Sequence, residues 1–504
     1  MTHALTVSAL LQGHSGPALG APDRPDLDFA ALRAQVARTG AQLAALGVGP
    51  GLAVAIALPN GPEMAACFLG VAAHATAAPL NPGYTADEFA FYIEDLGAEL
   101  LIVQQGVDSP ARIAAARLGT TLIELVPGDV PGSFDLCRDG VSLARGDATC
   151  NGAGDIALVL HTSGTTSRPK IVPLTSANIC TSAASIAATL HLTPGDRCLN
   201  IMPLFHIHGL IAAVLSSLST GAAITCAPGF DALRVYGWMK SARPTWYTAV
   251  PTMHQAILSR AARNTDVVAG AGLRFIRSSS APLPVPVLHD LEKTFGCRVI
   301  EAYGMTEAAH QMASNQLQPG LRKPGTVGAA AGPEVAIMSA DGALLAQGEV
   351  GEIAIRGANV TLGYLNNDKA NAENFTGGWF RTGDQGALDA DGFLTIRGRL
   401  KEIINRGGEK VSPGEVDAVL MEHPAVDQVV TFAMPHARLG EDVAAAVVLK
   451  DGALADEAAL RAHVATRLAA FKVPRKILIL GEIPKGSTGK LQRIGLAEKL
   501  GLGA

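Results

Sequence analysis

The sequence predicts an α/β protein with a large N-terminal domain of doubly wound sheets, a small β-rich subdomain and a small α+β C-terminal domain. Three observations support this fold class. Short apolar runs alternate with helical patterns over residues 1–150 and again over 180–305, as is typical of βαβ units in a parallel sheet. After about residue 325, D-G and G-G turns separate strand-like runs. With 504 residues, the chain is long enough to form more than one domain.

The first elements follow this alternation closely. An Ala-rich stretch predicts a helix over 30–47, AVAIALP predicts a strand over 53–59, and a second helix is predicted over roughly 61–74. The run TADEFAFYIEDLG predicts a third helix, with Thr85 as its cap and Glu88 three positions on, as in a capping box. The strand ELLIVQ follows. In open α/β sheets, ligands bind beyond the carboxyl ends of such strands.

The second alternation and the C-terminal pattern predict the remaining layout. The runs ITCA, RFIRS and RVIEAYG predict strands that end in small or polar residues. From about residue 411, the order helix, strand, strand, helix, strand predicts a compact α+β unit of about a hundred residues. The Gly- and charge-rich stretch 397–410 is the natural boundary. We therefore expect an N-terminal domain over 1–400 and a C-terminal domain over 401–504.

Composition and charge disfavour several classes of protein. Hydrophobic residues make up 48% and charged residues 17% of the chain, which argues against disorder. The net charge is −5 and no basic stripe occurs, so a nucleic-acid binder is not expected. No signal-peptide pattern or membrane-length apolar run is found. The seven Cys are scattered and never spaced as C-x-x-C, so neither disulfides nor a zinc site is expected. We expect a soluble, cytoplasmic protein with small-molecule partners.

The most informative motif is TSGTTSRPK, which runs from Thr162 to Lys170 between the apolar run IALVLH and a helical pattern. Its backbone N–H groups and hydroxyls can wrap a polyphosphate, and Arg168 or Lys170 can neutralise charge. Taken alone, the run also fits a solvated Ser/Thr-rich turn. It is not a Walker A motif, and the stretch that ends at Lys490 is not one either, because Pro484 occupies the first glycine position.

The run TSGTTSRPK resembles the phosphate loop of the adenylate-forming superfamily, which includes acyl-CoA synthetases, luciferases and peptide-synthetase adenylation domains. Further motifs follow in the order of the family and span nearly the whole chain. They are PLFHIH at 203–208, YGMTE at 303–307, TGD at 382–384, GRLKE at 398–402 and PKGSTGK at 484–490. The resemblance implies an enzyme with a mobile C-terminal domain beyond a hinge.

This resemblance implies an acid–thiol ligase that uses ATP, Mg²⁺ and coenzyme A. A carboxylate first attacks the α-phosphate of ATP and forms an acyl-adenylate with release of pyrophosphate. A thiol then displaces AMP. Enzymes lower such barriers mainly by positioning the reactants and by placing positive charge where negative charge gathers.

The resemblance also implies a role for each motif residue. Lys490 would contact both the substrate carboxylate and the α-phosphate, Glu307 would hold Mg²⁺, and His206 would line the acyl pocket; these three are the expected catalytic residues. The nucleotide would be bound by Tyr303 on the adenine, Thr306 on the α-phosphate, Asp384 and Arg399 on the ribose, and by Thr162, Ser163, Gly164, Thr165, Thr166, Lys170 and Gly304.

Lys401 matches the hinge position of the family. The resemblance implies that the C-terminal domain rotates there, withdraws Lys490 and presents Arg406, Gly407 and Gly408 to the coenzyme A channel. One departure from the family pattern is Ile171, where most relatives carry Gly.

For the acid, the runs HTSGTTSRPKIVPLT, MPLFHIHGL and RFIRSSSAPL look most like those of oxalate–CoA ligases, with malonate–CoA ligases next. No carrier-protein segment follows the C-terminal unit, which favours free coenzyme A over a peptide-synthetase module. A small diacid keeps a second charge in the pocket, and burying an unpaired carboxylate costs several kcal/mol. Such a pocket needs donors or a cation. His310 and Ser280 are the candidates, with His208 as a further one.

Three alternatives remain open at this point. One is a ligase for malonate, a medium-chain acid or an aromatic acid. Another is a non-catalytic nucleotide-binding protein that kept the fold, although the intact Lys490, Glu307 and Asp384 argue against it. A serine hydrolase is disfavoured because the chain contains no G-x-S-x-G motif.

Overall fold

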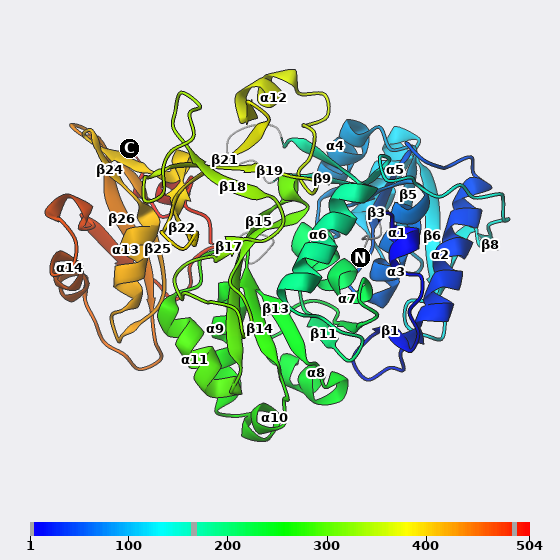
Figure 1. The fold of residues 1–504 in the computed structure, drawn as a ribbon, viewed down its shortest axis with the longest axis horizontal. Helices are drawn as coiled ribbons and strands as arrows, with labels where there is room; N and C mark the ends of the chain where they lie inside the picture. Colours follow the sequence, from blue (N-terminus) through cyan, green and yellow to red (C-terminus); the bar gives the residue numbers. More distant parts are fainter. Residues whose placement is uncertain (1–4, 163–168, 486–490, 504) are drawn as a thin grey trace.

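The computed structural model describes residues 5–162, 169–485 and 491–503 (Figure 1). Two large sheets, one small sheet and a C-terminal sheet make up the fold. The predicted fold class is confirmed. Within the described ranges, no helix combines the length and the apolar character that crossing a membrane requires.

An eight-stranded sheet forms the N-terminal part of the chain. Its central strands are parallel, and β10, β7 and β8 extend it in antiparallel fashion at the two edges. The order across the sheet is β10 (Ile171–Thr175), β9 (Ile156–His161), β4 (Thr76–Pro79), β3 (Ala53–Ala57), β5 (Leu100–Gln104), β6 (Thr121–Pro127), β7 (Phe134–Arg138) and β8 (Val141–Ser142).

Helices cover both faces of this sheet, as the alternation predicts. The predicted capping box is present, because the Thr85 hydroxyl accepts from the Glu88 backbone N–H while the Glu88 carboxylate accepts from the Thr85 backbone N–H. The helices are α1 (Val7–Leu10), α2 (Phe29–Ala44), α3 (Pro62–His74), α4 (Ala86–Leu96) and α5 (Pro110–Leu118).

A nine-stranded sheet lies beside the first in the centre of the molecule (Figure 1). It is parallel from β15 to β1 and antiparallel at its edges. The order is β17 (Ala329–Ala330), β16 (His310–Ser314), β15 (Arg298–Met305), β14 (Phe275–Ser279), β13 (Trp246–Ala249), β11 (Arg197–Asn200), β12 (Ala223–Cys226), β1 (Pro17–Gly20) and β2 (Leu27–Asp28). Its helices are α6 (Ser176–Thr189), the π-helix η1 (His208–Leu215), α7 (Ser216–Leu218), α8 (Val235–Ala242), α9 (Pro251–Ala261), α10 (Thr265–Ala269) and α11 (Val285–Phe295).

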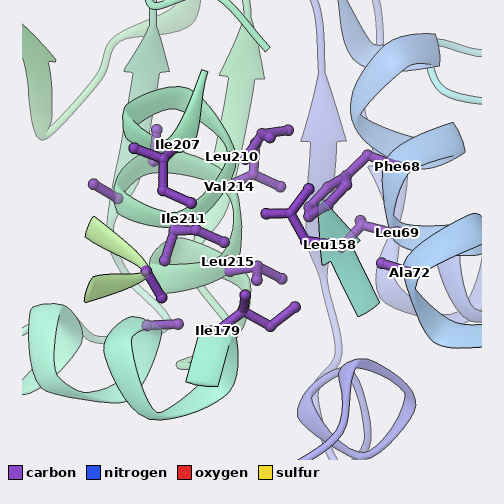
Figure 2. Packing of buried hydrophobic residues seen from close by; sticks show 14 of the residues in the cluster. Phe68, Leu69, Ala72, Leu158, Ile179, Ile207, Leu210, Ile211, Val214 and Leu215 are labelled. Carbon is purple, nitrogen blue, oxygen red and sulfur yellow. The ribbon is translucent and has the colours of Figure 1, made fainter. Parts of the chain in front are cut away.

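One buried cluster joins the two large sheets. Figure 2 shows its centre, where Phe68 and Leu69 of α3 approach Leu158 of β9 and face side chains of η1 such as Leu210 and Val214. Helices α3, α6 and η1 thus lie between the sheets and hold them in one relative position. This fixed position matters because the carboxyl ends of strands from both sheets carry the site.

Two small sheets complete the fold. The first consists of β18 (Glu334–Met338), β19 (Gly351–Arg356), β21 (Trp379–Leu388), β20 (Phe375–Thr376) and β22 (Leu394–Arg399), with helix α12 (Asp368–Asn374). The C-terminal sheet consists of β24 (Glu409–Val411), β23 (Ile404–Arg406), β26 (Gly440–Leu449), β25 (Val426–His436) and β27 (Lys476–Ile479), with helices α13 (Pro413–Met421), α14 (Glu457–Ala465) and α15 (Leu496–Lys499). The 3₁₀ turn η3 (Leu400–Glu402) connects the two sheets. The domain boundary at residue 400 stays a prediction.

The cluster between the large sheets predicts one stability effect. The Phe68 side chain is fully buried, so Phe68→Ala should leave a cavity and lower the free energy of unfolding by about 3–5 kcal/mol. Leu454→Ala is the matched control, because the Leu454 side chain is 96% exposed. Thermal denaturation should show a lower melting temperature for the first variant only. Equal melting temperatures would contradict this packing.

Candidate active site

The predicted site residues gather where strands of both large sheets end. Thr162 follows β9, Ser280 follows β14, and Tyr303 lies in the last part of β15. Glu307 follows in the short turn η2 (Thr306–Ala308). Six predicted residues lie outside the described residues: Ser163, Gly164, Thr165, Thr166, Arg168 and Lys490.

A buried carboxylate and a lysine both contact Tyr364 beside the predicted phosphate loop. The Tyr364 hydroxyl donates to Glu307 Oε1 at 2.9 Å, and Lys170 Nζ lies 4.4 Å from the centre of the Tyr364 ring. Burial raises the pKa of Glu307 and lowers the pKa of Lys170. The Glu307 charge counteracts the shift of Lys170, whereas Lys401 adds to it. Lys401, the predicted hinge residue, is therefore near this pair.

The two ends of the predicted phosphate loop are fastened to each other. The Thr162 backbone N–H donates to the Lys170 carbonyl at 2.9 Å, and the Lys170 N–H donates to Thr162 Oγ1 at 3.3 Å. Ile171 pairs with His161 across β10 and β9. A β-branched residue suits this position because it lies in a strand, which gives a physical reason for the departure from the family pattern.

Glu307 fits a Mg²⁺ site of the kind that nucleotides complete. Magnesium in nucleotide sites is usually held by one or two carboxylates together with substrate phosphates. Glu307 is 6% exposed and supplies one such carboxylate. In the part of the chain that the structure describes, no group of three or more His, Cys, Asp or Glu side chains could hold a metal ion without a ligand's help.

The residues predicted for the nucleoside also lie together. The Tyr303 hydroxyl donates to Asp384 Oδ2, and Arg399 Nε lies 3.4 Å from Asp384 Oδ1. Burial and the Asp384 charge hold the pKa of the Tyr303 phenol well above its usual value. This contact joins β15 of the central sheet to β21 of the small sheet, and strand pairing places Arg399 opposite Asp384.

The three predicted substrate residues form one cluster. His208 opens η1 and is fully buried. Its Nδ1 lies 3.0 Å from Ser280 Oγ, its Nε2 lies 2.6 Å from Thr248 Oγ1, and its ring centre lies 4.8 Å from that of His310. His206 is half-buried and accepts from the His208 backbone N–H at 3.2 Å. Helices of the π type are frequent at functional sites.

Backbone geometry brings His310 into this cluster. His310 has φ +97° and Ser280 has φ +73°, values that non-glycine residues adopt at a cost of about 1–3 kcal/mol. The chain doubles back so closely that a Cβ at Gly304 would lie 1.9 Å from the His310 carbonyl oxygen. Only glycine fits at residue 304, which is why the sequence carries it next to Tyr303.

Arg277 is the residue of this cluster that the sequence analysis missed. It lies on β14 and is fully buried. Its Nη1 lies 3.5 Å from His208 Nε2 and 3.4 Å from His310 Nε2, and its Nη2 donates to Gln311 Oε1 at 3.3 Å.

No Asp or Glu among the described residues forms an ion pair with Arg277. Burial lowers the pKa of Arg277 to about 9, so the guanidinium is still charged at neutral pH. The sequence feature that could have revealed Arg277 is a charged residue inside the run RFIRS, which predicts a strand.

The C-terminal residues lie apart from this cluster. Arg406 Nε lies 2.7 Å from Asp442 Oδ1 within the C-terminal sheet, and Gly407 and Gly408 form the turn between β23 and β24. Arg493, which the sequence analysis also missed, lies 3.3 Å from Glu402 and 2.7 Å from Asp417. It therefore ties Glu402, the residue after the predicted hinge, to Asp417 on helix α13.

Comparison with known proteins identifies the family. The sequence model of AMP-binding enzymes matches residues 14–365, and that of the AMP-binding enzyme C-terminal domain matches residues 415–490. The chain belongs to the AMP-binding enzyme family.

Among its relatives is "Oxalate--CoA ligase" of Arabidopsis thaliana, which is 44% identical over 94% of each chain. "Sulfoacetate--CoA ligase" of Cupriavidus necator is 34% identical over 98% of this chain and 96% of its own. The structure of ATP-bound MatB from Rhodopseudomonas palustris superposes with a TM-score of 0.88 at 29% identity over 99% of both chains. The predicted acid–CoA ligase class is thereby confirmed, and ATP and coenzyme A are consistent with this family.

Because Glu307 is buried, replacing its carboxylate should lower activity without lowering the stability of the fold. Because burial raises the pKa of Glu307, its charged form weakens the fold as pH rises above the ordinary glutamate range. Glu307→Gln keeps an acceptor for Tyr364 and removes the charge. It should abolish pyrophosphate release yet melt at an equal or higher temperature, with the gain larger at about pH 8 than at about pH 5.5.

Glu334→Gln is the control, because the pKa of Glu334 is shifted in the opposite direction from that of Glu307. A hydrogen bond from Arg356 holds the pKa of the exposed Glu334 below its usual value, so this variant should not gain stability as pH rises. A melting temperature of Glu307→Gln that falls below that of the parent protein with rising pH would contradict the account.

Proposed function

We propose that this enzyme activates a small dicarboxylic acid, with oxalate as the first candidate, and transfers it to coenzyme A. The observation that carries the proposal is the buried Arg277 guanidinium behind His208 and His310, with no described carboxylate as ion-pair partner. A buried charge is costly unless it is paired. An acid with a second carboxylate would supply the missing negative charge, whereas a hydrocarbon chain would leave it unpaired.

In the proposed first half-reaction, a carboxylate oxygen of the acid bonds to the α-phosphorus of ATP and pyrophosphate leaves. Thr162 and Lys170 fasten the phosphate loop, and Tyr303, Asp384 and Arg399 would hold the nucleoside. Lys490 would bring positive charge to the carboxylate and the α-phosphate. Mg²⁺ at Glu307 would neutralise charge on the phosphate oxygens, and Tyr364 would orient the Glu307 carboxylate through its hydrogen bond.

In the proposed second half-reaction, the coenzyme A sulfur bonds to the acyl carbon and AMP leaves. We propose that the C-terminal unit, residues 401–504, rotates at Lys401 between the two steps. Arg406, Gly407 and Gly408 would then line the coenzyme A channel. The Arg406–Asp442 pair lies within the C-terminal sheet, so it would move with that unit as one body. We expect this reaction to take place in the cytoplasm.

A second candidate acid also carries two negative charges. The Cupriavidus relative is named for sulfoacetate, in which a sulfonate takes the place of a second carboxylate. Malonate is a further candidate with the same charge and one more carbon atom. Medium-chain and aromatic acids are less compatible with a pocket lined by His208, Ser280 and His310.

Acid-dependent pyrophosphate release in the presence of coenzyme A tests this proposal. We expect oxalate to give a higher kcat/KM than malonate and sulfoacetate, and all three dianions to exceed acetate, octanoate and coumarate. A preference for any of the three monoacids would refute the proposed substrate class. If none of these acids triggers release, a non-catalytic nucleotide-binding protein that kept the fold would be favoured.

The proposed role of Lys490 predicts that its loss affects one half-reaction. Lys490→Ala should lower the rate of adenylate formation by at least about 100-fold. A positive charge placed where negative charge develops stabilises the transition state by several kcal/mol. Thioester formation from a pre-made acyl-adenylate should be spared. Lys485→Ala is the control, since this lysine belongs to the same segment and lies 3.7 Å from Glu482. Equal loss of both half-reactions in Lys490→Ala would contradict domain alternation.

A further inference from the structure

The hydrogen bonds around Arg277 fix where protons lie in the acyl pocket. A guanidinium donates hydrogen bonds and accepts none. Because Arg277 Nη1 faces Nε2 of both His208 and His310, each Nε2 must be the unprotonated ring nitrogen. A protonated Nε2 would direct one N–H against another. The proton of each neutral imidazole therefore lies on Nδ1.

The proton position on His208 also fixes the hydrogen bonds that it makes with Thr248 and Ser280. Thr248 Oγ1 lies 2.6 Å from the same Nε2, so the Thr248 hydroxyl donates to it. The Nδ1–H group of His208 then donates to Ser280 Oγ, which lies 3.0 Å away. Because Ser280 Oγ is occupied as an acceptor, the hydroxyl proton of Ser280 points away from the ring.

Burial shows which member of this chain meets the ligand. Arg277, Thr248 and His208 are fully buried, whereas Ser280 is half-buried at the end of β14. For His310, the Nδ1 atom lies toward the end of β15, since a Cβ at Gly304 would be 2.3 Å from it. Ser280 is thus the most accessible member of a chain of hydrogen bonds that begins at the buried Arg277 guanidinium.

We propose that Arg277 is the positioning residue for substrate selection: through His208 it directs the Ser280 hydroxyl proton toward the second anionic group of the acid. Arg277 does not touch the acid in this arrangement. It supplies the unpaired positive charge and fixes the tautomers, and Ser280 delivers the hydrogen bond. This inference rests on the proposed function, because it assumes an acid with a second anionic group.

The test compares two acids of equal size that differ in charge at one end. Oxalate carries a second carboxylate, and oxamate carries a neutral amide in its place. KM and kcat for oxalate are measured by pyrophosphate release, and oxamate is measured as a substrate or by its inhibition constant against oxalate. In the parent protein, oxalate should bind at least about 100-fold more tightly than oxamate, as expected for a buried charge that gains a partner.

Arg277→Met should raise KM for oxalate by about 100-fold and change the oxamate value by less than about threefold. Arg277→Lys keeps the charge and should recover at least half of the lost preference on a logarithmic scale. Arg274→Met is the matched control on the same segment. Arg274 pairs with Asp196 at 2.7 Å and is 40% exposed, so its loss should leave the ratio of oxalate to oxamate unchanged.

A double-variant cycle tests the chain of hydrogen bonds even if Arg277→Met does not fold. Arg277→Lys and Ser280→Ala should each weaken oxalate, and together they should lose little more than the larger single effect, because both interrupt one chain. Effects that multiply in the double variant would overturn the inference. So would an unchanged oxalate preference in Arg277→Lys and Arg277→Met. If the parent protein itself does not prefer oxalate, the proposed function fails instead.

Discussion

A buried guanidinium with no ion-pair partner among the described residues is the constraint on which the proposed acid-binding end of this site depends. Taking a charge out of water costs several kcal/mol unless an opposite charge compensates it. Around Arg277 the described hydrogen-bond partners carry no negative charge: they are two imidazoles and the Gln311 amide. They satisfy some of its N–H groups but leave its charge unbalanced. Under the proposed function, a site built this way would favour an anion over a neutral or apolar group, and its selectivity would be set by the fold before a ligand binds.

Strands and a helix of the packed core hold the Arg277 guanidinium and its neighbours in place. Arg277 and Thr248 lie on neighbouring parallel strands, β14 and β13. His208 opens a helix that is buried between the two large sheets. His310 reaches the cluster because Gly304 lets the chain double back at close range. The same strand ends carry Tyr303 and Glu307, so the residues predicted for the acid and those predicted for the nucleotide share one edge of the sheet.

Local patterns in the sequence predicted much of the fold. Side-chain contacts between residues far apart in the sequence could not be predicted from it. The capping box at Thr85 depends on residues three positions apart and was predicted correctly. The antiparallel edge strands β7 and β8 were missed because they are short and lack a strong apolar pattern. His208, Ser280 and His310 were predicted from motifs, and the structure places them in one cluster. Arg277 and Tyr364 were missed, because a charge within an apolar strand and a tyrosine in a loop acquire meaning only from their partners, His208 and Glu307.

The most direct measurement is a crystal structure of the protein with oxalate and a non-hydrolysable ATP analogue. The account predicts one carboxylate of oxalate near the α-phosphate and the other within hydrogen-bond distance of Ser280 Oγ, with Arg277 behind His208 and His310 and not in direct contact. A second carboxylate that turns toward solvent, or one that reaches the nucleotide instead of Ser280, would contradict the claim that the buried charge selects the acid.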